Sequence, residues 1–237
     1  MHRLTRLVGS TIIGVATALA IIAIAIPLFL NPAWVAFEQG RAQAAAWTGF
    51  DAADLHASTD SILHDLVIGP AAFDLTVAGR PVLDERERQH MRDVRGVFTG
   101  FFAVTAALGL AALAVAVWRR RSPSGRSASW SAVRAGAVGL AAGLIVVGAI
   151  ALVAFDALFE FFHRVLFPGG SYTFDPRTDR LVQLFPFDFW QETAIVLGVV
   201  CIVAATVVAL IAHRRLGVGH VVSATSMEPG AEPMTVR

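Results

Sequence analysis

Uncharged apolar blocks separated by charged segments form the main pattern along the chain. Four blocks, at 11–30, 96–118, 135–155 and 193–212, each contain 20 to 23 residues without a charged side chain. A helix of that length crosses the roughly 30 Å hydrocarbon core of a bilayer at about 1.5 Å per residue. The pattern therefore predicts an all-α membrane protein whose four transmembrane helices form an up-down bundle.

The segments between these blocks differ in length and character. Residues 31–95 and 156–192 are long and rich in charged and aromatic side chains, whereas residues 119–134 are short and resemble a flexible Arg/Ser/Pro/Gly linker. Residues 1–10 precede the first block, and residues 213–237 form a small polar tail, which we expect to be disordered. The sequence thus predicts two long loops on one side of the membrane and short connections on the other.

The first long loop contains two further predicted elements. Asp51–Val67 has apolar side chains at helical spacing and ends before Gly69-Pro70, which predicts a short amphipathic helix. Two alternating segments flank Ala78-Gly79, at 73–77 and 80–83, and predict a short β-hairpin. His56 and His64 fall within the predicted helix, and we interpret them as solvated scaffold residues.

The second block begins inside a densely charged segment. Asp84 followed three residues later by Glu87 matches a capping box, so one helix is expected to run from there through Trp118. His90 then lies about 9 Å before Gly96 on the same helix. This places a titratable side chain just outside the lipid.

Composition and charge refine this picture. The chain is 56% hydrophobic and 16% charged with a mean hydropathy of +0.64, which excludes an ordinary soluble domain. All 19 basic residues are arginines, and the two long loops contain sixteen acidic residues against nine arginines. The other polar segments are basic up to Glu228, so the positive-inside rule predicts a cell-membrane protein with cytoplasmic termini and extracytoplasmic loops. A cleaved signal peptide is the alternative for the first block, although the block is long for one.

Two histidines are the candidate chemical groups. His90 precedes the second block and His163 follows the third, each about two turns from the uncharged run, and neighbouring helices of a bundle lie about 8–10 Å apart. Both imidazoles could therefore reach one substrate. Glu87 and Asp93 near His90, and Glu160 near His163, are carboxylates that could orient the rings and raise their basicity.

Three other interpretations remain open. The two E-x-x-H motifs ending at His90 and His163 are also used by di-metal carboxylate proteins of four-helix bundles, but the first and fourth blocks lack the acids that would complete such a site. A non-catalytic lipid- or partner-binding protein would need the loops but not both histidines. A transporter would place polar or charged side chains within its spans, which here contain only scattered Ser and Thr.

Two motif blocks resemble a known family. ERERQHMRDVR at 85–95, and FHRVLFPGG-x-Y-x-FDP-x-TD-x-L-x-x-LFP-x-x-FW at 162–190, are similar to the bacterial lipoprotein intramolecular transacylases, four-span membrane enzymes that make lyso-form lipoproteins. The resemblance covers about a third of the chain, and His90 and His163 fall where the family has its functional histidines. Ser171-Tyr172 stands where a tryptophan-containing pair is expected.

The resemblance implies an acyltransferase that moves the sn-2 acyl chain of a diacylglyceryl-cysteine to the α-amino group of that cysteine. Histidines suit the proton transfers, with His163 expected as the base and His90 as its partner acid or orienting group. Diacylated lipoproteins are the expected substrate within membrane lipid. We expect no cofactor, no metal, no nucleic acid and no obligate protein partner. The donors that could stabilise the oxyanion are Arg92, Arg164, Tyr172 and the backbone amides of Gly169 and Gly170, although both arginines could equally bind lipid phosphate.

Overall fold

The computed structural model describes residues 2–225 and is almost entirely helical. Its α-helices are α1 (His2–Ala25), α2 (Pro32–Arg41), α3 (Ala44–Thr48), α4 (Ala52–Val67), α5 (Glu85–Arg119), α6 (Pro123–Leu166), α7 (Arg180–Leu184) and α8 (Phe187–Thr225). A 3-10 turn at Ile26–Leu28 follows α1, and the strands β1 (Thr76–Val77) and β2 (Arg80–Pro81) form an antiparallel hairpin. The structure confirms the predicted hairpin and amphipathic helix.

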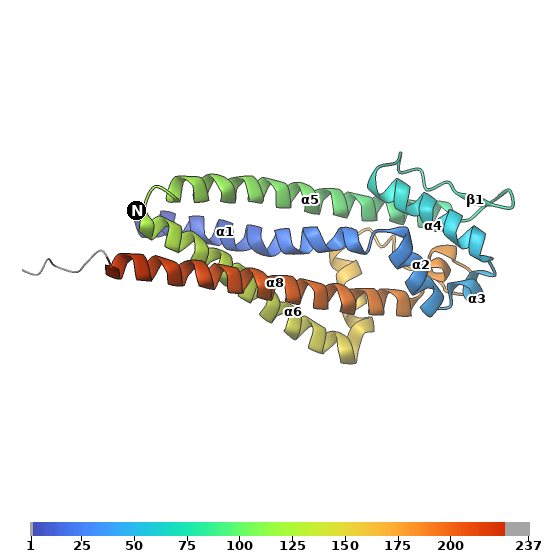
Figure 1. Cartoon of the computed structure of the whole chain (residues 1–237). Coiled ribbons are helices and arrows are strands. Elements are labelled where there is room, and N and C mark those ends of the chain that lie inside the picture. Colours follow the sequence, from blue (N-terminus) through green and yellow to red (C-terminus); the bar gives the residue numbers. More distant parts are fainter. Residues whose placement is uncertain (1, 226–237) are drawn as a thin grey trace, which may run out of the picture.

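The four predicted transmembrane helices are also confirmed. The helices α1, α5, α6 and α8 are all long and apolar enough to cross a membrane. In Figure 1 they run lengthwise, with α1 between α5 and α8. The helix α6 packs against both α1 and α8 and much less against α5. The helices α1 and α6 therefore each contact the other three spanning helices, and α5 is attached to the bundle mainly through α1.

A pair of glycines lets α1 and α6 approach closely. A Cβ atom on Gly136 would lie only 2.1 Å from the carbonyl oxygen of Gly14, so the two backbones are in direct contact there. Ala137 beside it is fully buried. Small residues commonly form helix contacts within membranes because they allow such close packing.

The helix α6 bends sharply at Ala154. Ala154 has non-helical torsions, φ −150° and ψ 46°, although the helix continues on both sides. Figure 1 shows α6 running away from α5 and then turning back toward the bundle. The twelve residues after the bend make about three turns, or roughly 18 Å of helix. No proline or glycine adjoins Ala154, and nothing in the local sequence explains the bend.

The two long connections pack together at one end of the bundle, which we call the loop end (residues 31–84 and 167–186). Its core unites residues from α4, the hairpin region, the first turns of α5 and α7, and it includes Ile62, Leu66, Phe73, Leu83, Met91, Leu181 and Leu184. Ile62, Leu63 and Leu66 of the predicted α4 stripe are buried, whereas Val67 is exposed. The loop end is thus a folded unit seated on α5.

Two expectations about the opposite end are wrong. The connection predicted as a flexible linker is mostly helical, because α6 starts at Pro123 with Ser122 as its N-cap and only Arg120–Ser122 separates it from α5. The helix α8 continues to Thr225, so the first part of the tail predicted to be disordered is helical as well. Residues 226–237 lie outside the described residues.

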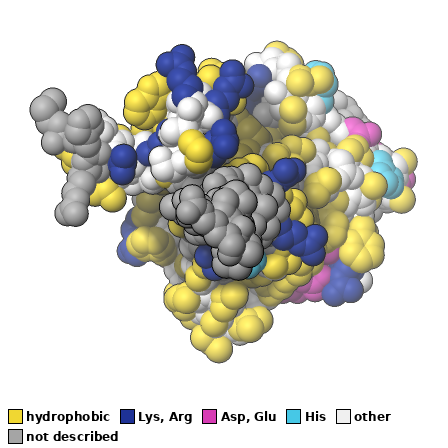
Figure 2. Space-filling view, turned by 60° about the vertical axis from the view of Figure 1, so that its left-hand side comes forward, with side chains coloured by type: hydrophobic (Ala, Val, Ile, Leu, Met, Phe, Trp, Pro, Cys, Tyr) yellow, Lys and Arg dark blue, Asp and Glu magenta, His cyan; other side chains and the backbone are white. Residues whose placement is uncertain are grey.

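Arginine side chains gather at the end of the bundle opposite the loop end. Figure 2 shows several around the end that carries the short α5–α6 connection, with acidic side chains visible only toward the far edge. Arg119 is buried there, where it donates hydrogen bonds to the Ser10 hydroxyl (3.1 Å) and to the Arg6 carbonyl (2.7 Å). This arginine therefore fastens α5 to α1.

Candidate active site

His90 and His163 lie side by side where α5 meets the turned-back end of α6. Their ring centroids are 6.0 Å apart with an interplanar angle of 25°, which is a stacked arrangement. His90 is only 6% exposed, and His163 is half-buried. His90 precedes the uncharged run of α5, and His163 follows the uncharged run of α6. The bend at Ala154 is what returns His163 toward α5.

Aromatic rings enclose the two imidazoles. The Phe167 ring contacts both of them, with centroids 4.8 Å from His90 and 5.6 Å from His163. Phe174 lies 5.4 Å from His90, while Phe159 and Tyr172 lie 4.1 Å and 5.3 Å from His163. These rings exclude water from one side of each histidine.

This enclosure lowers the pKa of both histidines. Burial lowers the pKa of His90 to about 4, and the neighbouring His163 adds to that effect while the Asp93 carboxylate opposes it. Burial also lowers the pKa of His163, against the Phe159 carbonyl and the Glu160 carboxylate, which favour its charged form. Both rings are therefore neutral at neutral pH.

A backbone hydrogen bond fixes the tautomer of His163. Its Nδ1 lies 2.8 Å from the Phe159 carbonyl oxygen. A carbonyl only accepts, so Nδ1 must donate, which leaves Nε2 of the neutral ring with a free lone pair. Nδ1 of His90 is buried and has no hydrogen-bond partner within the described residues. The pair thus offers one oriented proton acceptor and one unsatisfied ring nitrogen.

Two of the three predicted carboxylates remain near the pair. Asp93 accepts hydrogen bonds from the Ser171 hydroxyl at 2.8 Å and from the Gln89 amide at 2.9 Å. Glu160 accepts a long hydrogen bond of 3.4 Å from the Tyr172 hydroxyl. Neither is hydrogen-bonded to a histidine ring in this structure. Their influence on the imidazoles is therefore electrostatic.

Glu87 has a different place from the one expected. It is 2% exposed, and its oxygens accept from the backbone N–H of Asp84 at 2.7 Å and of Leu181 at 2.6 Å. The first bond completes the predicted capping box. Burial raises the pKa of Glu87, and the two backbone hydrogen bonds partly offset that rise. The carboxylate thus holds α7 against α5 rather than orienting His90.

The position of Glu87 also weakens the di-metal interpretation. A metal bound by an E-x-x-H motif needs the Glu and the His to converge, but the Glu87 oxygens are committed to backbone amides. Among the side chains that the structure describes, no three of His, Cys, Asp or Glu are arranged to hold one ion. The described residues therefore do not fit a di-metal centre.

The candidate oxyanion donors fall into two groups. Arg92 points along α5, bonded to Glu85 (2.5 Å) and Gln89, and the Gly170 amide already donates to the Phe167 carbonyl at 3.0 Å. Tyr172 lies against His163. Arg164 and Gly169 are both exposed, and among the described residues neither the Arg164 side chain nor the Gly169 backbone N–H makes a hydrogen bond. Of these candidates, Tyr172 has the recorded ring contact with the histidine pair, and its hydroxyl donates the long hydrogen bond to Glu160.

Several residues of the site were not singled out from the sequence. The spacing of Phe159 and His163, four residues apart on one helix, was a usable signal for their contact. Phe167 and Phe174 lie in a loop whose path the sequence does not specify, and Ser171 reaches Asp93 across 78 positions. Long-range contacts of this kind need the tertiary fold.

The fold and the site define an integral membrane protein with four membrane-crossing helices and a buried pair of neutral histidines at one end of the bundle. Residues 11–190 match the family model described as lipoprotein intramolecular transacylase Lit. The chain belongs to this family and is an acyltransferase. The predicted family, fold class and enzyme class are confirmed.

Solved structures share the whole fold. The membrane-integral lipoprotein intramolecular transacylase Lit from Bacillus cereus superposes with a TM-score of 0.72 at 15% identity, covering 94% of this chain and 99% of that chain. A variant of that protein with one histidine replaced by alanine gives a TM-score of 0.71 at 16% identity, covering 96% and 98%. A second variant, with arginine at that position, gives 0.72 at 15%. The comparison with curated proteins finds no match.

Proposed function

We propose that this enzyme moves the sn-2 acyl chain of a diacylglyceryl-cysteine to the α-amino group of the same cysteine, with His163 as the base. Substrates of this type are the N-termini of diacylated lipoproteins, anchored in the membrane by their acyl chains. The family assignment supports a lipoprotein substrate. The position of the histidine pair, just beyond the uncharged helix segments, supports a reaction at the depth of a lipid ester.

The reaction needs one carbon–nitrogen bond to form and one ester bond to break. The amine nitrogen attacks the acyl carbonyl carbon through an eight-membered ring, and the glycerol oxygen leaves. Closing that ring is entropically unfavourable, so holding both ends of the substrate is a large part of catalysis. The closely spaced rings of Phe167, Phe174 and Tyr172 provide walls that restrict a flexible lipid.

The proton balance points to distinct roles for the two histidines. The attacking amine loses one proton and the glycerol oxygen gains one. Nε2 of His163 has the free lone pair that can take this proton and return it to the leaving oxygen. His90, with a pKa of about 4, has no extra proton to give at neutral pH. Its unsatisfied Nδ1 instead binds and orients the reacting group.

The observation that carries the proposal is the fixed tautomer of His163 beside the buried, unsatisfied His90. A merely structural histidine at 94% burial would be expected to satisfy its ring nitrogens. Arginines at the opposite end of the bundle support an extracytoplasmic site with both termini in the cytoplasm.

The test is mass spectrometry of lipoprotein N-termini from cells that depend on this protein. His90→Ala and His163→Ala should each abolish N-acyl transfer, and the double variant should be hardly worse than either alone, because groups that act together lose their function together. His56→Ala and His64→Ala, which replace exposed histidines, are the controls. Loss of a general base typically costs about 10²–10⁴-fold. Undiminished transfer by His163→Ala protein would refute the proposal.

A further inference from the structure

We propose that Arg86 and Asp179 are positioning residues, which clamp the second long loop over the histidine pair and so keep His90 dry and in place. The inference rests on the proposed function, because it assigns these residues a part in the same reaction. They lie on opposite sides of the contact between the first turn of α5 and the segment before α7. Neither touches the histidine rings directly.

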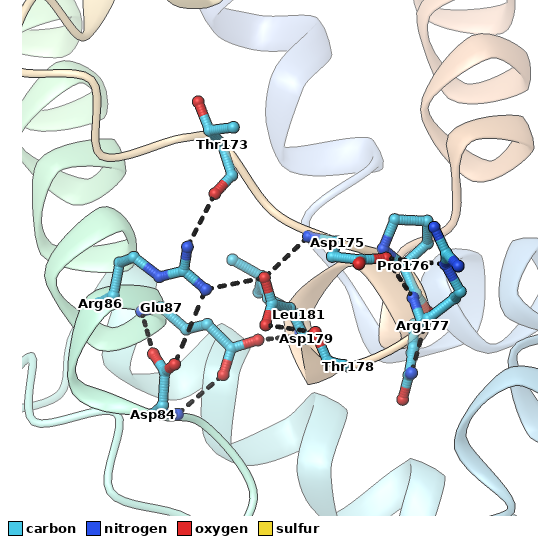
Figure 3. Close-up of polar contacts among 11 residues, drawn as sticks. Asp84, Arg86, Glu87, Thr173, Asp175, Pro176, Arg177, Thr178, Asp179 and Leu181 are labelled. Carbon is cyan, nitrogen blue, oxygen red and sulfur yellow. Dashed lines mark hydrogen bonds and ion pairs between the residues drawn. The ribbon is translucent and has the colours of Figure 1, made fainter.

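Arg86 makes three kinds of contact with the loop. Its guanidinium donates to the Thr173 carbonyl at 3.1 Å and to the Asp179 carboxylate at 2.8 Å, as Figure 3 shows. It also lies over the Phe174 ring, with Cζ 5.3 Å from the centroid. The guanidinium carries five N–H donors in a rigid planar fork and also stacks on aromatic faces, whereas an ammonium has three donors around a single point charge.

Asp179 is the residue of the second long loop whose carboxylate binds Arg86. It is 8% exposed, and the oxygen that accepts from Arg86 also accepts from the Asp175 backbone N–H at 2.8 Å. Its other oxygen accepts from the Thr178 hydroxyl at 3.1 Å. Burial acts to raise the pKa of Asp179, but these hydrogen bonds and the Arg86 charge together hold it below its usual value. The carboxylate thus organises the turn that Arg86 holds.

A second fastening lies one residue along α5. The Leu181 backbone N–H donates to the buried Glu87 carboxylate at 2.6 Å, so neighbouring residues of α5 bind both ends of the segment 173–181 (Figure 3). Within that segment Phe174 contacts Arg86 on one side and His90 on the other. The clamp therefore reaches His90 through a single aromatic ring.

Releasing the clamp should have a specific consequence. Phe174 and Phe167 are the rings that cover His90, and His90 owes its neutrality mainly to burial. The charged or polar groups that face it are His163 on α6 and Asp93 on α5. A loosened loop admits water to His90 and displaces the substrate. Misplacement by about 1 Å can cost about 100-fold in rate.

The experiment combines turnover with chemical footprinting on the full-length protein. Diethyl pyrocarbonate modifies accessible neutral imidazoles, and peptide mass spectrometry gives a separate rate for each histidine. Arg86→Met removes the clamp, Asp179→Asn removes only its negative charge, and Arg86→Lys keeps the positive charge. The control is Arg177→Gln on the same loop, since the Arg177 side chain is 87% exposed and, within the described part of the chain, its ion pair is with Asp175. Exposed His56 and His64 are internal references.

In Arg86→Met we expect modification of His90 to accelerate about tenfold or more and turnover to fall about 10- to 100-fold, with His56 and His64 unchanged. Asp179→Asn and Arg86→Lys should lie between this variant and wild type, and Arg177→Gln should match wild type. If Arg86→Met does not fold, the other two clamp variants decide. The inference would be overturned if folded clamp variants protected His90 from modification as well as wild type does. It would also be overturned if a variant with an accessible His90 kept full turnover.

A parallel measurement separates this inference from the proposed function. His163→Ala in the wild-type background tests the base alone. If His163→Ala is inactive and the clamp variants behave as wild type, only the clamp inference fails. If His163→Ala retains full turnover, the proposed function fails, and the positioning role fails with it even where the footprint changes.

Discussion

Acidification from about pH 7 to pH 4 is expected to destabilise the folded protein through His90. A histidine that is buried and neutral has a lower pKa when folded than when unfolded, so the unfolded chain binds more protons over this range. The stabilisation that His90 contributes is thus fully present above about pH 6.5 and is lost as the pH falls toward 4. The difference between a pKa of about 4 and the ordinary 6.5, at about 1.4 kcal/mol per pH unit, corresponds to about 3 kcal/mol.

The assay is denaturant unfolding in detergent at a series of pH values, followed by tryptophan fluorescence. His90→Gln keeps a polar side chain but cannot titrate, so its stability should fall about 3 kcal/mol less than that of wild type between pH 6.5 and 4. Part of the pH dependence should remain, because the pKa of His163 is also lowered. His64→Gln, an exposed position, should behave as wild type. Parallel pH profiles for wild type and His90→Gln would refute the burial argument.

Three further predictions concern packing, orientation and the oxyanion. Gly136→Ala places a Cβ atom 2.1 Å from a backbone oxygen of α1 and should lower the free energy of unfolding by about 1–3 kcal/mol, whereas Gly139→Ala meets nothing within 4 Å and should not. A cysteine at Ser124 should be labelled only from the cytoplasm and one at Thr76 only from outside; the reverse labelling would contradict the proposed orientation. Tyr172→Phe should slow acyl transfer about 10²–10³-fold if its hydroxyl stabilises the oxyanion, and unchanged turnover would exclude that role.

Periodic and local features of the fold could be predicted from the sequence. The four long helices follow from uncharged runs, because length and hydrophobicity alone decide whether a segment can cross lipid. The capping box at Asp84 and Glu87 and the hairpin at Ala78-Gly79 depend on residues only a few positions apart. The two histidines stood out for a similarly simple reason, since each lies next to such a run.

Features that depend on distant residues could not be predicted. The bend at Ala154 has no proline or glycine next to it in the sequence. This bend turns the end of α6, which carries His163, back toward α5. Glu87 has the spacing of a partner for His90, but the Leu181 N–H, 94 positions away, takes one of its oxygens. A helical spacing indicates which residues share a face, and the tertiary fold decides what that face meets.

The aromatic enclosure has a consequence for the substrate as well as for the enzyme. In the proposed reaction the attacking amine, with an ordinary pKa of about 7.7–8.0, must be neutral. The low-dielectric surroundings that lower the pKa of His90 act in the same direction on an ammonium group placed beside it, because burial disfavours any charged form. The phenylalanine rings around His90 and His163 therefore favour the reactive form of both the base and the nucleophile at neutral pH.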